Sequence, residues 1–87
     1  MKKIIAFLPK AFEDFSQCSA EDQKICAKIV ELIRNIERHP FSGLGKPEPL
    51  RHDLKGLWSR RITQKHRLVY KVAEEEIIIV SCKFHYR

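Results

Sequence analysis

The sequence predicts an α+β fold in which two helices pack on one face of a largely antiparallel four-stranded sheet. Apolar residues recur at helical spacing in the first half of the chain, and the second half contains short apolar or alternating runs that suit strands. These segments follow the order β-α-α-β-β-β, and such separation of helices from strands is typical of α+β proteins. We expect residues 1–87 to form one domain, because a chain of this length buries one modest core.

The first strand and the first helix are predicted near the N-terminus. Residues 2–8 contain a short apolar run that suits a buried strand. Pro9 then marks the start of a short helix, because proline is tolerated in the first helical turn. Ala11, Phe12 and Phe15 follow at helical spacing. We expect both phenylalanines to lie in the core.

A longer amphipathic helix is predicted next. Ser19 is a suitable N-cap, with Asp22 three residues further on, and His39 followed by Pro40 ends the helix. Between these ends, isoleucines recur at spacings of four, four and three residues, which places them on one buried stripe. The residues of this stripe are Ile25, Ile29, Ile33 and Ile36.

A loop and three strands complete the pattern. Residues 40–56 hold all three glycines and three of the four prolines, which predicts a long loop, and loops of this length usually carry function. Strands are predicted at residues 57–63, 67–73 and 77–84, separated by short polar turns. The last of them is almost wholly apolar, which indicates a central strand covered on both faces.

The composition excludes several classes of protein. Hydrophobic residues make up 44% of the chain and charged residues 32%, a balance that favours a globular protein over a disordered one. No apolar run approaches the length of a transmembrane helix. The apolar run at residues 4–8 is too short for a signal peptide and has no cleavage site after it. We therefore expect a cytoplasmic protein.

The three cysteines are expected to be reduced thiols. Cys18, Cys26 and Cys82 are odd in number, and no C-x-x-C motif or cysteine–histidine spacing indicates zinc. Cys18 and Cys26 would meet only if the chain turned back between them, so we do not expect a disulfide. We also expect no metal site and no cofactor.

The positive charge of the chain is concentrated in one segment. The formal net charge is +6. Residues 46–71 contain eight basic and two acidic residues, while the segments before and after are close to neutral, at +1 and −1. A local basic block is typical of a nucleic-acid-binding surface, although a solvated basic face without a ligand is the alternative.

Glu48 occupies an unusual position inside this basic segment. It follows Pro47 and precedes Pro49, and each proline restricts the backbone of the residue beside it. Lys46 and Arg51 lie close by in the sequence. A carboxylate held rigidly among basic residues suggests a chemical role rather than a solubilising one.

The predicted strands add residues that would complete an RNA-cleaving site. Arg61 and Arg67 lie near the turn between two strands, His85 follows the apolar last strand, and Tyr86 comes next. A carboxylate or histidine can remove the proton of a ribose 2′-OH, arginine can hold the charge on the phosphate, and an acid can protonate the leaving 5′ oxygen. Each of these side chains also has an ordinary surface role as an alternative.

Four distinctive blocks resemble the YoeB group of the RelE toxin superfamily. They occur in order in the second half of the chain: G-K-P-E-P-L at 45–50, W-S-R-R-I at 58–62, H-R-L-V-Y at 66–70 and C-K-F-H-Y at 82–86. The resemblance implies a RelE-like fold, which agrees with the order of elements predicted above. It also implies a type II toxin that cleaves messenger RNA in the ribosomal A site.

The resemblance assigns roles to individual residues. Glu48 matches the general base of the family, Arg67 the arginine that stabilises the phosphate, and His85 the general acid. The positions that match RNA-binding residues are Lys46, Arg51, Arg61 and Tyr86.

The same resemblance implies partners and shows three departures from the family. The partners are the ribosome with its mRNA, a YefM-like antitoxin with an acidic C-terminal segment, and a second copy of the chain in a homodimer; no membrane is implied. Arg51 stands where relatives have lysine, Phe84 where tyrosine is frequent, and Ala6 where a tryptophan is usual.

Two other functions compete with mRNA cleavage. A non-catalytic basic module would bind RNA or the ribosome and block translation sterically. A RelE-fold toxin could also act on another target, such as a topoisomerase, but the combination of Glu48, Arg67 and His85 argues against that class.

Overall fold

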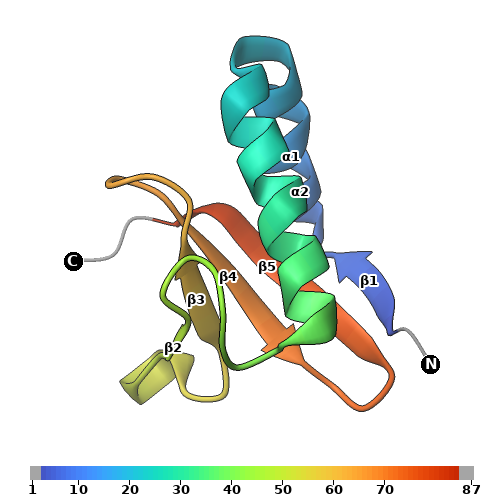
Figure 1. Cartoon of the computed structure of the whole chain (residues 1–87), viewed down its shortest axis with the longest axis vertical. Coiled ribbons are helices and arrows are strands. Elements are labelled where there is room, and N and C mark those ends of the chain that lie inside the picture. Colours follow the sequence, from blue (N-terminus) through green and yellow to red (C-terminus); the bar gives the residue numbers. More distant parts are fainter. Residues whose placement is uncertain (1–2, 85–87) are drawn as a thin grey trace.

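The computed structural model describes residues 3–84, apart from the side chains of residues 19–21 and 84 (Figure 1). A five-stranded sheet has the order β1-β5-β4-β3-β2, in which β1 runs parallel to β5 and the other neighbours are antiparallel. The elements are β1 (Ile4–Phe7), α1 (Pro9–Glu21), α2 (Gln23–Arg38), β2 (Glu48–Pro49), the 3₁₀ helix η1 (His52–Leu54), β3 (Trp58–Arg61), β4 (Arg67–Val72) and β5 (Glu76–Phe84).

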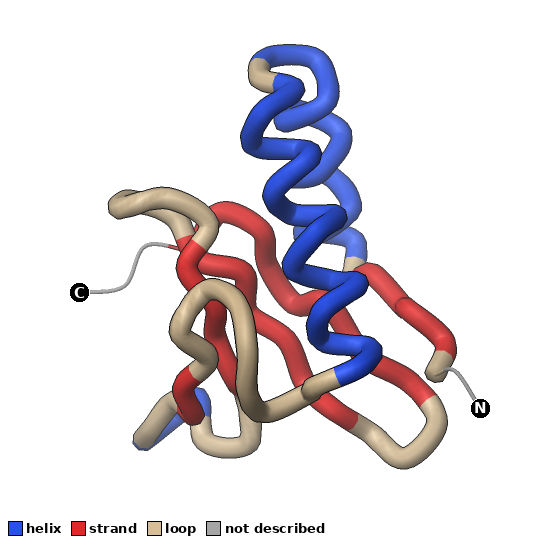
Figure 2. The backbone as a smooth tube through the Cα atoms, in the orientation of Figure 1, coloured by secondary structure: helices blue, strands red, loops and turns tan. Residues whose placement is uncertain are grey.

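The α+β class and the order of the main elements are confirmed. Both helices lie on one side of the sheet, as the blue and red segments of Figure 2 show. The sheet has one strand more than expected, because Glu48–Pro49 pairs with β3 inside the segment predicted to be a loop. This strand is short and lies at the sheet edge, where a proline without an N–H group is tolerated.

The start of the second helix differs from the prediction. Ser19 lies inside α1, and the N-cap of α2 is Asp22. The Asp22 carboxylate accepts hydrogen bonds from the backbone N–H groups of Lys24, at 3.0 Å, and Ile25, at 3.4 Å. A cap that satisfies two free donors fixes the helix start at this residue. The predicted start at Pro9 and end at His39 are confirmed, and neither helix in the described part of the chain could span a membrane.

The core lies between the two helices and the sheet. The predicted stripe of α2 is buried at Ile29, Ile33 and Ile36, whereas Ile25 is partly buried. Phe12 was expected in the core but is 62% exposed. The buried face of α1 runs through Ala11, Asp14 and Cys18 instead, with partly buried Phe15 packed beside it, and Phe12 falls outside that stripe.

A buried carboxylate ties α1 to the central strand. Asp14 is 5% exposed, and its Oδ2 accepts hydrogen bonds from the backbone N–H of Cys82, at 3.1 Å, and the hydroxyl of Ser81, at 3.4 Å. Lys10 pairs with the other oxygen at 3.1 Å. The register of β5 against β4 is irregular around Ser81. The Asp14 carboxylate gives this stretch of β5 a hydrogen-bond partner in addition to the neighbouring strand.

A buried arginine ties the segment after α2 to the sheet. Arg60, on β3, is 0% exposed, and its guanidinium donates to acceptors that precede β2 in the chain. Nη2 donates to the carbonyls of His39 and Ser42, and Nη1 to the carbonyl of Leu44 and the side chain of Asn35. The segment between α2 and β2 is therefore fixed against the strand that β2 joins.

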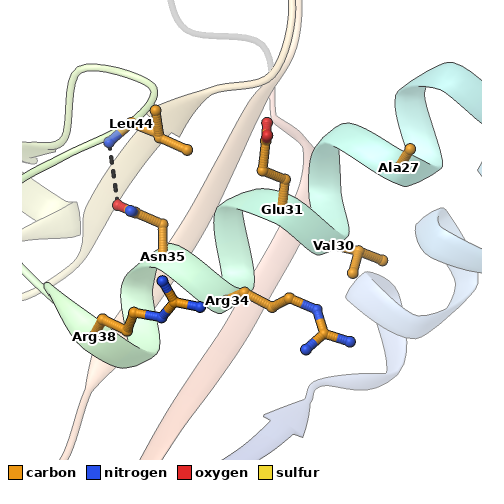
Figure 3. Close-up of a pocket in the computed structure, with 7 residues that line it drawn as sticks. All are labelled: Ala27, Val30, Glu31, Arg34, Asn35, Arg38 and Leu44. Atoms are coloured by element: carbon orange, nitrogen blue, oxygen red, sulfur yellow. Dashed lines mark hydrogen bonds between the residues drawn. The ribbon is translucent and has the colours of Figure 1, made fainter.

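Three further groups complete this network. Arg60 Nε donates to the Tyr70 hydroxyl at 3.1 Å, and that hydroxyl donates to the carbonyl of Pro40 at 2.8 Å. Burial raises the pKa of Tyr70, an effect that the hydrogen bond and the charge of Arg60 oppose. The Asn35 side chain also accepts from the backbone N–H of Leu44 at 3.1 Å (Figure 3).

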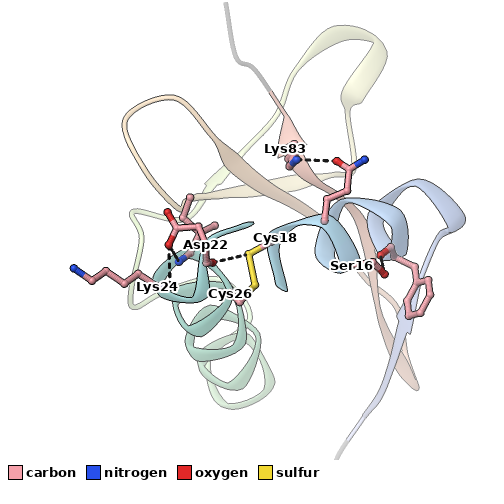
Figure 4. The surroundings of a disulfide bond; sticks show 9 residues. Ser16, Cys18, Asp22, Lys24, Cys26 and Lys83 are labelled. Carbon is pink, nitrogen blue, oxygen red and sulfur yellow. Dashed lines mark hydrogen bonds between the residues drawn. A yellow bond between two sulfur atoms is a disulfide. The ribbon is translucent and has the colours of Figure 1, made fainter. Parts of the chain in front are cut away.

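The expectation of three reduced thiols is wrong for two of them. Cys18 and Cys26 form a disulfide, with their Cα atoms 5.6 Å apart. The chain turns back at Asp22, so the end of α1 lies against the start of α2 (Figure 4). Cys82 is a buried free thiol, and burial raises its pKa to about 12. The negative charge of Asp14 adds to this increase.

Cysteine labelling tests this arrangement. Iodoacetamide should label no thiol in the native protein purified without reductant, because Cys82 is buried and its thiolate is scarce at pH 8. Unfolding without reductant should expose one thiol, and unfolding with reductant three. A Cys82→Ser variant, unfolded without reductant, should give none. Labelling of three thiols without reductant would contradict the disulfide.

Replacement of Arg60 should destabilise the protein far more than replacement of its neighbour. Arg60→Ala removes all five hydrogen bonds of the guanidinium from a fully buried position, and we expect a loss of about 3 kcal/mol in the free energy of unfolding. Arg61→Ala, at an exposed position of the same strand, should change it by about 0.5 kcal/mol or less. Urea denaturation of both variants measures the difference, and equal losses would refute the structural role of Arg60.

Candidate active site on the exposed face of the sheet

The structure brings Glu48 and Arg67 together from different parts of the chain. Arg67 Nη1 lies 3.2 Å from Glu48 Oε1. Glu48 belongs to β2 and Arg67 begins β4, with β3 between the two strands. The Arg67 side chain is 17% exposed and the Glu48 side chain 47% exposed, so both groups can be reached from solvent. This pair is the centre of the candidate site.

Strand register places further residues on the same face. Glu48 lies opposite Ser59, and Arg61 lies opposite Arg67. Directly opposed residues of antiparallel strands project to the same side of a sheet. The alternate residues of β3, including Arg60, point to the helices instead. Arg61 is exposed, as expected for a residue that would meet RNA.

The segment before Glu48 makes a tight approach to α2 and β3. Gly45 has φ +79°, and its carbonyl accepts a hydrogen bond from the Arg61 N–H at 2.7 Å. A Cβ on Gly45 would lie 2.9 Å from Leu32 Cδ2, so a larger residue does not fit. Lys46 follows with φ +52° and an exposed side chain. The positive φ angles of Gly45 and Lys46, followed by Pro47, set the direction in which the chain enters β2.

Ser59 is a candidate site residue that was not predicted from the sequence. It is 0% exposed and lies opposite Glu48, and its hydroxyl has no hydrogen-bond partner among residues 3–84. A hydroxyl can donate or accept a hydrogen bond, so Ser59 offers an unused polar group beneath Glu48. Alternation along β3 already placed Ser59 on the face of Arg61. The missing information was the pairing of β2 with β3.

Two predicted site residues lie outside the described residues. His85 and Tyr86 follow Phe84, the last residue of β5, and Phe84 is the register partner of Arg67. Arg51 is exposed and immediately precedes η1, where it acts as the N-cap of that short helix without a side-chain hydrogen bond. The described residues therefore bring Glu48, Arg61 and Arg67 together, with Lys46 two residues before Glu48.

The site has no cluster of metal-binding side chains within the described residues. No group of three or more histidine, cysteine, aspartate or glutamate side chains is close enough there to hold a metal ion. The polar groups around the contact between Glu48 and Arg67 include one carboxylate, two arginines and a hydroxyl. This set suits the binding of a phosphate and the transfer of protons.

Comparison with known proteins identifies the family. The family model described as a YoeB-like toxin of bacterial type II toxin-antitoxin systems matches residues 7–86. The toxin YoeB of Escherichia coli K12 is 48% identical over 77 residues, which cover 88% of this chain and 92% of that protein.

Solved structures agree with this relationship. The YoeB dimer from Staphylococcus aureus superposes with a TM-score of 0.93 at 46% identity, covering 99% of this chain and 100% of that one. The toxin in the heterotetrameric YoeB–YefM toxin–antitoxin complex from the same species gives a TM-score of 0.89 at 46% identity, with the same coverage. From these matches over nearly its full length, the chain belongs to the family of YoeB-like toxins of bacterial type II toxin–antitoxin systems.

Proposed function

We propose that this toxin is a ribosome-dependent endoribonuclease that cleaves mRNA in the ribosomal A site and so inhibits translation. The observation that carries the proposal is the contact between Glu48 and Arg67 on a solvent-accessible basic face. A carboxylate beside an arginine places a candidate base next to a candidate phosphate ligand. Membership of the YoeB-like family supports the same reading.

The proposed reaction is an attack by a ribose 2′ oxygen on the adjacent phosphorus. Glu48 removes the 2′-OH proton, the new O–P bond forms, and the bond to the 5′ oxygen breaks. His85 donates a proton to that oxygen, which leaves as a 5′-OH. The other product carries a 2′,3′-cyclic phosphate. The proton transfers are assigned to side chains, so the proposed step is metal-independent, and the need for a 2′-OH restricts the substrate to RNA.

Arg67 can exchange its contact with Glu48 for a contact with a phosphate. A guanidinium carries five N–H donors in a fixed fork, and Nη1 of Arg67 lies nearest the Glu48 carboxylate. The Glu48 carboxylate is 47% exposed, so solvent screens the pair and allows it to rearrange when substrate binds. The same guanidinium can then stabilise the negative charge that increases on the phosphate oxygens in the transition state.

The partners follow from the same surface. In the S. aureus complex a related toxin is assembled with YefM. We infer that a YefM-like antitoxin with an acidic C-terminal segment binds the basic face of this chain, where Lys46, Arg51 and Arg61 are exposed. The S. aureus YoeB dimer supports a homodimer of this toxin. Its site of action would be the cytoplasm, where the ribosomes are.

Substitutions at the three proposed catalytic positions should abolish cleavage. Glu48→Gln, Arg67→Ala and His85→Ala should each slow single-turnover cleavage of ribosome-bound mRNA by about 10²- to 10⁴-fold, since each removes a proton transfer or the charge that stabilises the phosphate. Primer extension on the mRNA measures the rate. Lys71→Gln, which removes an exposed charge from β4, is the matched control and should cleave normally.

The same variants distinguish cleavage from steric inhibition. A non-catalytic module would stop translation equally well with glutamine at position 48, and would lose activity when Arg61 and Arg67 are reversed in charge. Undiminished inhibition of in vitro translation by Glu48→Gln, with intact mRNA, would therefore overturn the proposed chemistry.

A further inference from the structure

A second basic surface extends from the candidate site toward α2. A shallow groove of about 330 Å³ lies between the middle of α2 and the end of β3 with the turn that follows it. Its cationic side chains are Lys28, Lys46 and Arg61, and its polar side chains are Thr63 and Gln64. These residues come from three separate segments of the chain, and none of the described residues that line the groove carries a carboxylate.

The groove borders the site around Glu48 through Arg61 and Lys46. Arg61 is the cross-strand partner of Arg67, so one arginine borders the groove and the other contacts Glu48. Lys46 lines the groove two residues before Glu48. A polyanion bound at Arg67 would therefore reach Arg61 and Lys46 first and Lys28 next.

The three cations are held where they are by backbone contacts and by the helix. The N–H of Arg61 donates to the Gly45 carbonyl at 2.7 Å, which fixes β3 against the residue before Lys46. Lys28 projects from α2, which is anchored in the core by the neighbouring residue Ile29. The spacing of the charges is therefore a property of the fold.

One carboxylate competes for Lys28. Glu31 Oε1 lies 3.4 Å from Lys28 Nζ, and the two side chains are 59% and 38% exposed, respectively. Exposed ion pairs three residues apart on a helix contribute little to stability, because solvent screens them. A phosphate bound at this position would displace Glu31 at little cost.

The chemistry of the groove favours a nucleic-acid backbone over a protein segment. Amphipathic protein segments bind through apolar anchors that enter apolar pockets. The apolar side chain that lines this groove, Ile62, is only 7% exposed. By contrast, the neighbouring groove on α2 in Figure 3 presents exposed Val30 and Leu44 beside its arginines.

We propose that the groove of Lys28, Lys46 and Arg61 is a subsite for the phosphate backbone of single-stranded RNA next to the cleaved bond, with Lys28 as a phosphate contact. This inference rests on the proposed function, because it extends the path of the same RNA. It adds Lys28 of α2 to the RNA-binding residues, whereas no residue of this helix was predicted from the sequence to belong to the site.

The salt dependence of RNA binding tests the role of Lys28. The probe is a single-stranded 2′-O-methyl RNA of about a dozen nucleotides, a length that covers a typical single-strand binding site. Its blocked 2′ oxygen prevents cleavage. Lys28→Gln should reduce the slope of log K against log salt by about 0.7, the value for one phosphate contact on a single strand. Glu31→Gln should tighten binding, because it removes the competing carboxylate.

Lys24→Gln is the matched control. Lys24 is an exposed lysine in the first turn of the same helix and does not line the groove. It should leave the slope unchanged. Equal slopes for Lys28→Gln and Lys24→Gln would overturn the proposal. So would a Lys28-dependent affinity for a polyglutamate peptide together with unchanged RNA binding, which would make the groove a docking site for an acidic protein segment.

The test of the groove can fail or succeed independently of the test of the proposed cleavage. If Glu48→Gln abolishes cleavage while Lys28→Gln leaves the salt slope unchanged, only the groove proposal fails. If Lys28→Gln lowers the slope while the parent protein cleaves no ribosome-bound mRNA, only the catalytic proposal fails.

Discussion

The buried guanidinium of Arg60 is the constraint on which the site depends. A buried charge costs several kcal/mol unless its hydrogen bonds are satisfied. Here all five N–H groups of Arg60 have acceptors: the Tyr70 hydroxyl, the Asn35 side chain and the carbonyls of His39, Ser42 and Leu44. Three of these acceptors, the carbonyls of His39, Ser42 and Leu44, belong to the segment between α2 and β2, so the network can form only when that segment lies against β3.

This constraint decides where Glu48 is placed. The chain leaves the Arg60 network at Leu44, passes Gly45 in a conformation that leaves no room for a side chain, and enters β2 through Pro47. β2 then pairs with one edge of β3, where Glu48 lies opposite Ser59. The other edge of β3 pairs with β4, which carries Arg67. The carboxylate and the arginine are 19 residues apart in the sequence, and their contact at 3.2 Å exists only because β3 joins both strands.

The sequence was sufficient to predict the class of fold and most helices and strands, because the spacing of apolar residues indicates which face of an element is buried. Prediction from the sequence was wrong where two local signals compete for the same role. Ser19 and Asp22 are both good N-caps, and only the packing of the helical hairpin selects Asp22. The same turn brings Cys18 to Cys26, which spacing alone did not indicate. Phe12 fits a helical stripe, but the smaller Ala11 and the hydrogen-bonded Asp14 face the sheet instead.

The site was predictable in part. The resemblance selected Glu48, Arg61 and Arg67, and the structure places all three on the exposed face. The contribution of Arg60 was not foreseen, although a signal was present: strand alternation put this charged residue on the apolar face with Trp58 and Ile62. A charge at such a position requires a full set of acceptors, and three of the five acceptors are backbone carbonyls, which the sequence does not reveal.

The proposed roles of Glu48 and His85 are tested most directly with an RNA whose leaving 5′ oxygen is replaced by sulfur. A thiolate leaves without a proton, so such a substrate needs no general acid but still needs a base to activate the 2′-OH. If Glu48 is the base and His85 the acid, this substrate restores cleavage by His85→Ala and leaves Glu48→Gln inactive. Restoration of Glu48→Gln, or failure to restore His85→Ala, would contradict the assignment of the two roles.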